Sequence, residues 1–341
     1  MQRWIASALL GLAFLGFYLF LKPEEPIVRE AGFAMPLGCS LGETCWIARY
    51  SDRDPSEGKA DYRCGRRAQH GHKGTDFAIA NYGDMWRGVP VFAVAEGKVL
   101  RIRDTMQDIS VQQTGRKAVK GKECGNAVVI EHEGGLTTQY CHMKMGSIDV
   151  APGESVKRGQ QIGQLGLSGD TEYPHMHLNV RRGGKRIDPF DGQSLDVACN
   201  AENIPDDGRT NMWTDRLIYQ EMDLLPLVFS DKPLTRQSRW KAPQGAILKD
   251  EPALILTGIA WNVLEGDKWE FTIVRPDGSR ATNQKLVAKK NRQSQWYANR
   301  LFQPKGGFMT GIWKGKLTIT RTGTEGSVQT FEREGEVLVT E

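Results

Sequence analysis

All six histidines of this 341-residue chain lie between positions 70 and 177, and the segments on either side contain none. They are His70, His72, His132, His142, His175 and His177. Neutral imidazole binds zinc and other transition metals, and it can also accept or donate a proton near neutral pH. The clustering therefore predicts a metal site, an acid–base site or both in this part of the chain.

The first candidate motif is His72-Lys73-Gly74-Thr75-Asp76, which supplies an imidazole nitrogen and a carboxylate oxygen. Both are donors that Zn²⁺ accepts. Gly74 and the run Phe77-Ala78-Ile79-Ala80 favour a loop that enters a strand, so the two donors would converge through a local bend. Taken alone, the pair also fits a surface histidine and aspartate that are neighbours by chance.

The second motif is His175-Met176-His177. In a β-strand the side chains at positions i and i+2 project from the same face, so both imidazoles would point into one site. Met176 would face the opposite way into apolar packing, and Leu178-Asn179-Val180 supports an extended strand. The alternative for this motif alone is a histidine-rich strand with a solvated face.

The third motif is Tyr140-Cys141-His142, at the end of a predicted hairpin. Simple alternation along the strand places His142 on the face of Tyr140 and turns Cys141 toward the core. A lone strand histidine is more often structural than catalytic, so the assignment of His142 to the functional site depends on the other motifs. His132, close to the hairpin turn, and His70 have the weakest claims.

In combination and in this order, the motifs of residues 66–190 resemble the lysostaphin-type, or LytM-type, peptidoglycan endopeptidases. The family pattern is a His and an Asp separated by three residues, then Tyr-x-His, then His-x-His. The segments Pro90-Val91-Phe92-Ala93, Gly97-Lys98-Val99 and Lys157-Arg158-Gly159-Gln160-Gln161-Ile162-Gly163 are also similar to the scaffold of that family. The resemblance covers about a third of the chain.

The resemblance implies a Zn²⁺ ion held by His72, Asp76 and His177, with His142 and His175 as catalytic residues. Three protein ligands leave the fourth tetrahedral position for a water, as in catalytic zinc sites. One of the two catalytic histidines would take the proton of that water and the other would stabilise the oxyanion. The sequence leaves this division open, with His142 favoured as the base. The chain has no HExxH motif, which excludes a thermolysin-like enzyme.

The elements that must position these residues are short β-rich runs separated by glycine and proline. Glu133-Gly134-Gly135 predicts a hairpin between two of them. Residues 101–124 lack apolar patterning and predict a long loop of the kind that lines clefts. Residues 32–67 also read as loops, stapled by Cys39 and Cys45. The predicted strands span residues 89–94, 97–100, 127–131 and 137–140.

The second half of the chain predicts further strands at residues 253–257, 269–274, 316–320 and 336–339, which suit a small β-sandwich. The fold class is therefore all-β. We expect a LytM-like antiparallel catalytic domain over residues 68–198 and an accessory β-sandwich over residues 210–341, joined by a polar linker near residues 203–208. Large aromatics are usually buried, so the tryptophans of the second domain are expected in its core rather than on glycan. They are Trp261, Trp269, Trp296 and Trp313.

The N-terminus reads as an export signal, with Arg3 followed by an unbroken apolar stretch from Trp4 to Leu21. Its end lacks the small residues of a cleavage site, which favours an uncleaved anchor over residues 1–22, with a cleaved signal peptide as the alternative. Residues 23–67 would then be a tether with cysteine-bearing loops. The expected location is periplasmic or otherwise extracytoplasmic, tethered to the inner membrane. The six cysteines make disulfides plausible there, and no CxxC pair suggests thiolate zinc.

The charge composition limits the classes of molecule that this protein could bind. The 45 Lys and Arg nearly balance the 41 Asp and Glu without dense basic clusters, which excludes a nucleic-acid surface. The expected substrate is the peptide stem or cross-link of peptidoglycan, and the C-terminal domain could hold a protein partner. One alternative is a non-catalytic LytM-like regulator of another wall hydrolase, which should lack a ligand, yet all five site residues are present. Another is a structural protein whose C-terminal domain grips a partner or glycan.

Overall fold

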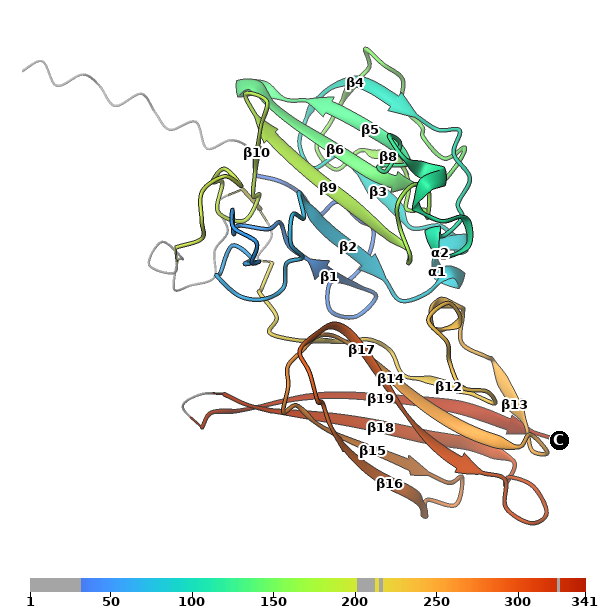
Figure 1. Cartoon of the computed structure of the whole chain (residues 1–341). Coiled ribbons are helices and arrows are strands. Elements are labelled where there is room, and N and C mark those ends of the chain that lie inside the picture. Colours follow the sequence, from blue (N-terminus) through green and yellow to red (C-terminus); the bar gives the residue numbers. More distant parts are fainter. Residues whose placement is uncertain (1–31, 201–211, 215–216, 324–325) are drawn as a thin grey trace, which may run out of the picture. The chain divides into compact units, whose positions relative to one another are not determined.

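The computed structural model describes residues 32–200, 212–214, 217–323 and 326–341 (Figure 1). The predicted anchor at residues 1–22, the first part of the tether and the linker near residues 203–208 lie outside the described residues. Among the described residues, no helix is both long enough and apolar enough to cross a membrane. The described chain is mostly β, as the sequence predicts.

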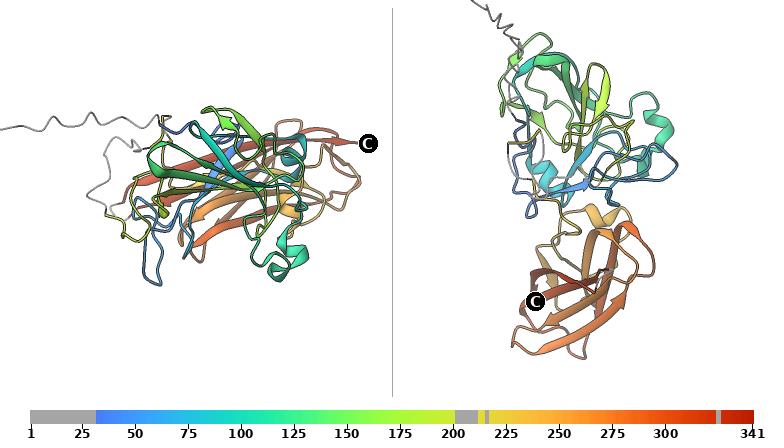
Figure 2. Two further views of the ribbon diagram at one scale, coloured as in Figure 1. Left: turned by 90° about the horizontal axis from the view of Figure 1, so that it is seen from above. Right: turned by 90° about the vertical axis from the view of Figure 1, so that its left-hand side faces the viewer.

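One antiparallel sheet carries the candidate site residues. Its strands follow the order β1-β2-β9-β6-β5-β4-β7, with β10 paired to β9 (Figure 1), and Figure 2 shows the same sheet from two further sides. Strands β3 and β8 form a separate pair. The bounds are β1 Cys45–Arg49, β2 Thr75–Ile79, β3 Pro90–Phe92, β4 Gly97–Arg103, β5 Asn126–Glu131, β6 Leu136–Met143, β7 Ser155–Val156, β8 Gln161–Gln164, β9 His175–Arg182 and β10 Lys185–Ile187.

The two faces of β9 have different environments because side chains alternate along a strand. Met176 and Leu178 are fully buried in the first hydrophobic core, together with Phe77 of β2. His175 and His177 face the other way and line a cleft. The prediction that Met176 packs opposite the histidine pair is therefore confirmed.

The remaining predictions for this region have mixed outcomes. The hairpin is confirmed, since β5 and β6 pair antiparallel around the short 3₁₀ turn η2, Glu133–Gly135. The loop predicted at residues 101–124 begins after β4 and holds only the short helices α2, Val111–Thr114, and η1, Arg116–Val119. The interpretation of residues 32–67 as loops is wrong at β1, which pairs with β2 at the edge of the sheet. The helix α1, Tyr82–Arg87, follows β2.

Three disulfides join the six cysteines in the described part of the chain. Cys39–Cys45 confirms the predicted staple. Cys64–Cys199 links the loops before β2 to the segment that follows β10. Cys124–Cys141 links the predicted long loop to β6.

The second half of the described chain forms two sheets that share a second hydrophobic core. Trp269 and Trp313 are each 1% exposed in this core, and Trp261 is 1% exposed in a third cluster with Trp46 and Tyr173, which confirms that these three are buried. Trp296 is only partly buried, so its predicted burial is wrong. One sheet contains β11 Asp223–Leu224, β12 Val228–Ser230, β14 Ala253–Val263 and β17 Arg292–Phe302. The other contains β13 Ala246–Leu248, β15 Lys268–Val274, β16 Arg280–Val287, β18 Gly311–Thr322 and β19 Val328–Thr340.

Removal of the Cys124–Cys141 disulfide by a Cys124→Ala/Cys141→Ala double substitution should lower the free energy of unfolding by about 3 kcal/mol, because the bond closes a loop of 17 residues' separation. Urea unfolding followed by fluorescence measures this loss. The matched variant Cys39→Ala/Cys45→Ala opens a separation of only 6 residues and should lose about 2 kcal/mol. An unchanged unfolding midpoint for the first variant would contradict the expectation.

Candidate metal centre

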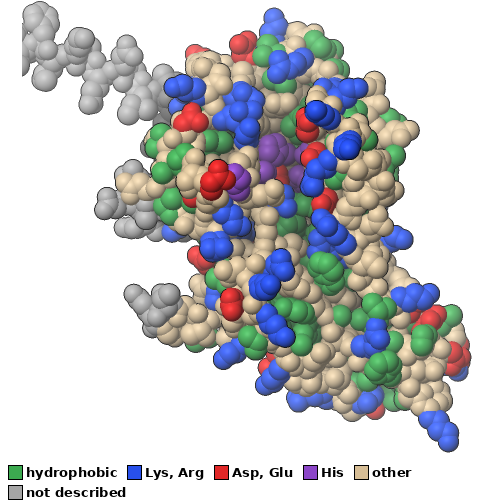
Figure 3. Space-filling model, in the orientation of Figure 1, with side chains coloured by type: hydrophobic (Ala, Val, Ile, Leu, Met, Phe, Trp, Pro, Cys, Tyr) green, Lys and Arg blue, Asp and Glu red, His purple; other side chains and the backbone are tan. Residues whose placement is uncertain are grey.

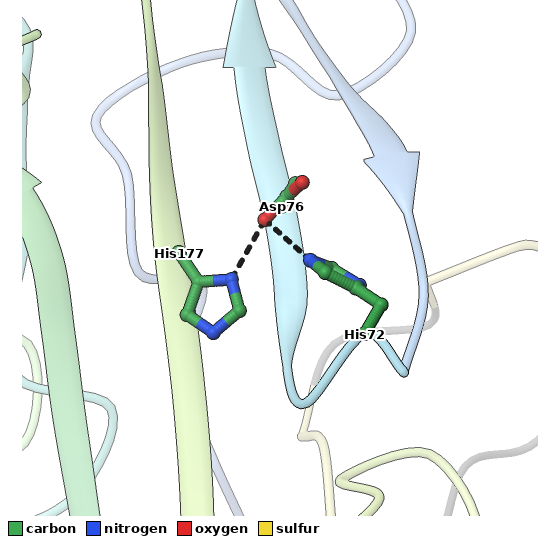
Figure 4. Close-up of side chains that lie close together, drawn as sticks. All are labelled: His72, Asp76 and His177. Carbon is green, nitrogen blue, oxygen red and sulfur yellow. Dashed lines mark hydrogen bonds and ion pairs between the residues drawn. The ribbon is translucent and has the colours of Figure 1, made fainter. Parts of the chain in front are cut away.

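Strand register brings the three metal-binding candidates together. In the antiparallel pair β2–β9, Asp76 lies opposite His177. His72 belongs to the turn that precedes β2, and its ring points back toward the Asp76 carboxylate (Figure 4). Two paired strands and one adjacent turn therefore each contribute one side chain to the same point.

The distances between these side chains suit a shared metal ion. Asp76 Oδ1 lies 2.8 Å from His177 Nδ1 and 3.1 Å from His72 Nε2 (Figure 4). The three donor atoms all lie within 4.8 Å of one another. Two imidazole nitrogens and one carboxylate oxygen are the donor types of a catalytic zinc site, so Zn²⁺ is the metal that this set fits.

The orientation of His72 is fixed by a backbone group on its far side. Its Nδ1 lies 2.8 Å from the carbonyl oxygen of Tyr50, which can only accept a hydrogen bond. Nδ1 therefore donates to this carbonyl, and Nε2 faces Asp76. Metal-binding histidines are commonly held in this way, with the second ring nitrogen donating to a carbonyl.

Burial and neighbouring charges set the protonation of the cluster. Burial alone would raise the pKa of the Asp76 carboxyl, but the imidazoles of His72 and His175 and hydrogen bonds from His177 and His72 hold that pKa well below its ordinary value. Burial is the main cause that lowers the pKa of His175 to about 4. It also lowers the pKa of His177, and that of His142 falls well below its ordinary value. At neutral pH these three imidazoles are therefore neutral beside a carboxylate, and a neutral His177 with an ionised Asp76 is the state that metal binding requires.

His142 reaches the site through a β-bulge. The register pairs Val128 with Tyr140 and Asn126 with Met143, so β6 has one residue more than β5 between these pairs. The extra residue is accommodated by His142, whose φ of 64° is left-handed. Tyr140 and Met143 are fully buried in the core. The prediction from simple alternation is therefore wrong.

In place of that alternation, Cys141 and His142 both line the cleft. Cys141 does not face the core, and His142 does not share the face of Tyr140. The disulfide of Cys141 with Cys124 lies on the cleft side of the sheet as a result.

His142 and His175 form a second pair beside the three ligand candidates. Their ring centroids are 4.7 Å apart. Nδ1 of His142 donates to the Ser168 carbonyl at 2.8 Å, and Nδ1 of His175 donates to the Tyr173 carbonyl at 3.0 Å. In each neutral ring Nε2 is therefore a proton acceptor, and Nε2 of His175 lies 3.5 Å from Asp76 Oδ1.

A cleft of about 840 Å³ opens over these residues, and all five candidates line it. Figure 3 shows the histidines in a hollow of the surface flanked by Lys and Arg side chains. Arg116, Glu123 and Cys124 of the predicted long loop also line the cleft, as expected for that loop. The remaining basic residues of the lining are Arg49, Lys73, Arg181, Arg186 and Arg236.

Sequence reasoning missed two residues of the site. Arg49 of β1 lies opposite Asp76, with its guanidinium 3.7 Å from Asp76 Oδ2. Tyr173 stacks on His175 with ring centroids 4.6 Å apart. The only sequence signal for Arg49 was the short apolar run before it, which was not recognised as a strand, and Tyr173 had none beyond its closeness to His175.

The two histidines that the sequence least supports as site residues, His132 and His70, lie apart from the three candidate metal ligands. His132 is buried, with ring nitrogens 2.6 Å from the Glu96 carbonyl and 2.7 Å from Thr138 Oγ1, so both ring nitrogens have protein partners. His70 is exposed at the rim of the cleft, and its Nδ1 lies 3.0 Å from the Gly58 carbonyl. Neither offers a nitrogen to the metal centre.

Comparison with known proteins gives a match over the same segment. The family model of Peptidase family M23 matches residues 70–189. Among similar curated proteins, the peptidoglycan DD-endopeptidase ShyB of Vibrio cholerae is 33% identical over 117 residues, which are 34% of this chain and 22% of that protein. The DD-carboxypeptidase/endopeptidase Mpg of Neisseria meningitidis is 30% identical over 120 residues, 35% of this chain and 22% of that protein. The chain thus spans about a fifth of the length of these curated relatives.

Among solved structures, a zinc containing peptidase from Vibrio cholerae is 28% identical, covers 41% of this chain and 39% of that chain, and has a TM-score of 0.27. The family match contains the His72–Asp76 pair, the Tyr140–His142 motif and the His175–His177 pair. The resemblance seen in the sequence is therefore confirmed: residues 70–189 match the model of Peptidase family M23.

Proposed function

We propose that this protein is a zinc metalloendopeptidase that hydrolyses peptide cross-links of bacterial cell-wall peptidoglycan. The observation that carries the proposal is the convergence of His72, Asp76 and His177 beside a pair of neutral histidines in one cleft. The substrate class is supported by relatives whose names describe peptidoglycan DD-endopeptidases.

In this proposal His72, Asp76 and His177 hold the metal ion. When bound, zinc lowers the pKa of a water and polarises the scissile carbonyl. The His72 ring is already oriented by Tyr50, and Asp76 is already ionised, so the ligands need little rearrangement.

In this proposal His142 and His175 act in proton transfer and in stabilising the oxyanion. Both neutral rings present Nε2 as an acceptor, and we assign His142 as the base that takes the proton of the attacking water. The protonated ring can then donate to the departing amine. The oxyanion role of His175 requires a proton on its Nε2, and the Asp76 carboxylate 3.5 Å away would stabilise that form.

The rest of the chain would place this activity outside the cytoplasm. We propose that residues 1–22 anchor the protein in the inner membrane and that residues 23–67 tether a catalytic domain at residues 68–198. Residues 210–341 would form an accessory β-sandwich. The three disulfides support an oxidising compartment. A regulator without activity is disfavoured because no site residue has been lost.

The His72→Ala variant should lose its zinc, because only two of the three protein ligands would remain to hold about one ion per chain. We expect the affinity to fall by about 100-fold or more, measured by metal analysis after gel filtration. The control is His70→Ala, which removes the same side chain from the exposed rim and should keep its zinc. Stoichiometric zinc in His72→Ala would remove this residue from the ligand set.

The His175→Ala variant should keep its zinc and lose about 100-fold or more in cleavage rate, because His175 acts on protons and not as a ligand. Digestion of purified sacculi, read by muropeptide mass, measures the loss of cross-linked dimers. Wild-type protein that carries zinc but leaves the dimers intact would count against the proposed activity. Full activity of His175→Ala would count against its catalytic role.

Gly74→Ala should weaken zinc binding by about tenfold or more, because no space exists for a methyl group beside His177. A Cβ at position 74 would clash with the Leu178 carbonyl oxygen and would lie 2.5 Å from His177 Nε2. The carbonyl belongs to the backbone of β9 and cannot move freely, so the turn that carries His72 and Gly74 must shift away from His177. Zinc titration measures the effect, and Gly245→Ala, where nothing lies within 4 Å, is the matched control. Equal zinc affinities of the two variants would contradict the steric argument.

A further inference from the structure

Two arginines lie opposite each other in the cleft of the candidate metal centre. The strands β9 and β10 are antiparallel, and their register pairs Arg181 directly with Arg186. Both side chains line the same cleft as His177. Like charges that face each other on neighbouring strands destabilise a sheet, so this pair costs free energy unless an anion lies between the two guanidinium groups.

Neither arginine has an acidic partner within the described ranges of the chain. Nε of Arg186 is buried and has no hydrogen-bond partner there. Partial burial, followed by the positive charges of Arg186 and Arg101, lowers the pKa of Arg181 below its ordinary value. Guanidinium groups form two parallel hydrogen bonds with a carboxylate, and a partly buried pair without such a partner is suited to receive one.

Asn179 provides a second, independent feature between the metal centre and the arginine pair. It lies on the cleft-facing side of β9, two residues from both His177 and Arg181. The side chain is 6% exposed, and its Nδ2 donates to the Lys73 carbonyl at 2.7 Å. Its Oδ1 is buried without a partner among the described residues. Buried acceptors of this kind are uncommon, and a backbone N–H of a bound peptide would satisfy this one.

These residues form a line along one strand. The Cα atoms of His177 and Arg181 are about 13 Å apart, at about 3.3 Å per strand residue. We propose that Arg181 and Arg186 bind a free carboxylate of the substrate peptide and that Asn179 accepts a hydrogen bond from the backbone of that peptide.

This inference rests on the proposed function, because it places a peptide at the metal centre. It goes further in naming the substrate class: peptides with a free carboxylate a few residues from the scissile bond would be preferred over glycine bridges. Glycine residues within a bridge have no side-chain carboxylate to offer to Arg181 and Arg186.

Cross-linked muropeptide dimers test the subsite. They are used in native form and after carbodiimide coupling with ammonia, which converts free carboxylates into amides. With the zinc-loaded full chain, kcat/KM should be about tenfold or more higher for the native dimer, mainly through a lower KM, because the charge-assisted hydrogen bonds are lost on amidation. The Arg181→Gln/Arg186→Gln variant should lower kcat/KM for the native dimer to the value for the amidated one.

The matched control is Lys98→Gln, which removes one positive charge from an exposed side chain of β4, outside the cleft lining. It should change kcat/KM by less than about twofold. Arg186→Lys keeps the charge but not the planar fork, and it should retain part of the preference. Zinc content of each variant shows that the domain is folded.

Two results would overturn the subsite. One is an equal preference of wild type for both dimers. The other is an equal loss on both dimers in the double variant with its zinc intact, which would show a structural role. If wild type cleaves neither dimer, the proposed function fails and the subsite is judged by calorimetric titration of the uncleaved dimers. Tighter binding of the native dimer, absent in the double variant, would support it, and equal affinities would reject it.

Discussion

Asp76 places a carboxylate that is only 1% exposed within a sheet, and a buried charge of this kind is costly unless it is paired. Neighbouring elements supply the compensation. Arg49 of β1 lies 3.7 Å from Oδ2, while His177 of β9 and His72 of the preceding turn lie 2.8 Å and 3.1 Å from Oδ1. A slip of one residue in the β1–β2 or β2–β9 pairing would turn Arg49 or His177 to the opposite face. The buried carboxylate therefore favours this strand register, and only this register brings Arg49 and His177 to the carboxylate.

The bulge at His142 adds a second constraint on the same sheet. A left-handed conformation at a residue with a Cβ costs about 1 kcal/mol or more and persists only where the surroundings hold it. The amide of His142 donates to the Cys124 carbonyl at 2.8 Å, and Ser168 Oγ donates to the Met143 carbonyl at 2.8 Å. The Cys124–Cys141 disulfide fixes the neighbouring residue. Several contacts therefore maintain a conformation that turns one imidazole from the core side into the cleft.

Local periodicity explains how far the sequence could predict this site. The pair His175 and His177, with Met176 turned away, follows from a two-residue repeat that needs no knowledge of the neighbouring strands. The place of His142 depends on an extra residue relative to β5, and that of Arg49 on pairing with β2, so neither could be predicted from its own segment. The long strands β16 and β17 were also missed, because their mostly exposed and half-exposed residues lack an apolar pattern.

The family segment does not complete the cleft by itself. Tyr173 stacks on His175 with ring centroids 4.6 Å apart and on Trp240 at 5.1 Å. The adjacent Glu172 accepts a hydrogen bond from Arg236 at 2.6 Å, and Arg236 also lines the cleft. Trp240 and Arg236 lie beyond residues 70–189. Because the three candidate metal ligands lie in the family segment and Arg236 and Trp240 lie outside it, the segment alone does not determine which peptides this cleft accepts.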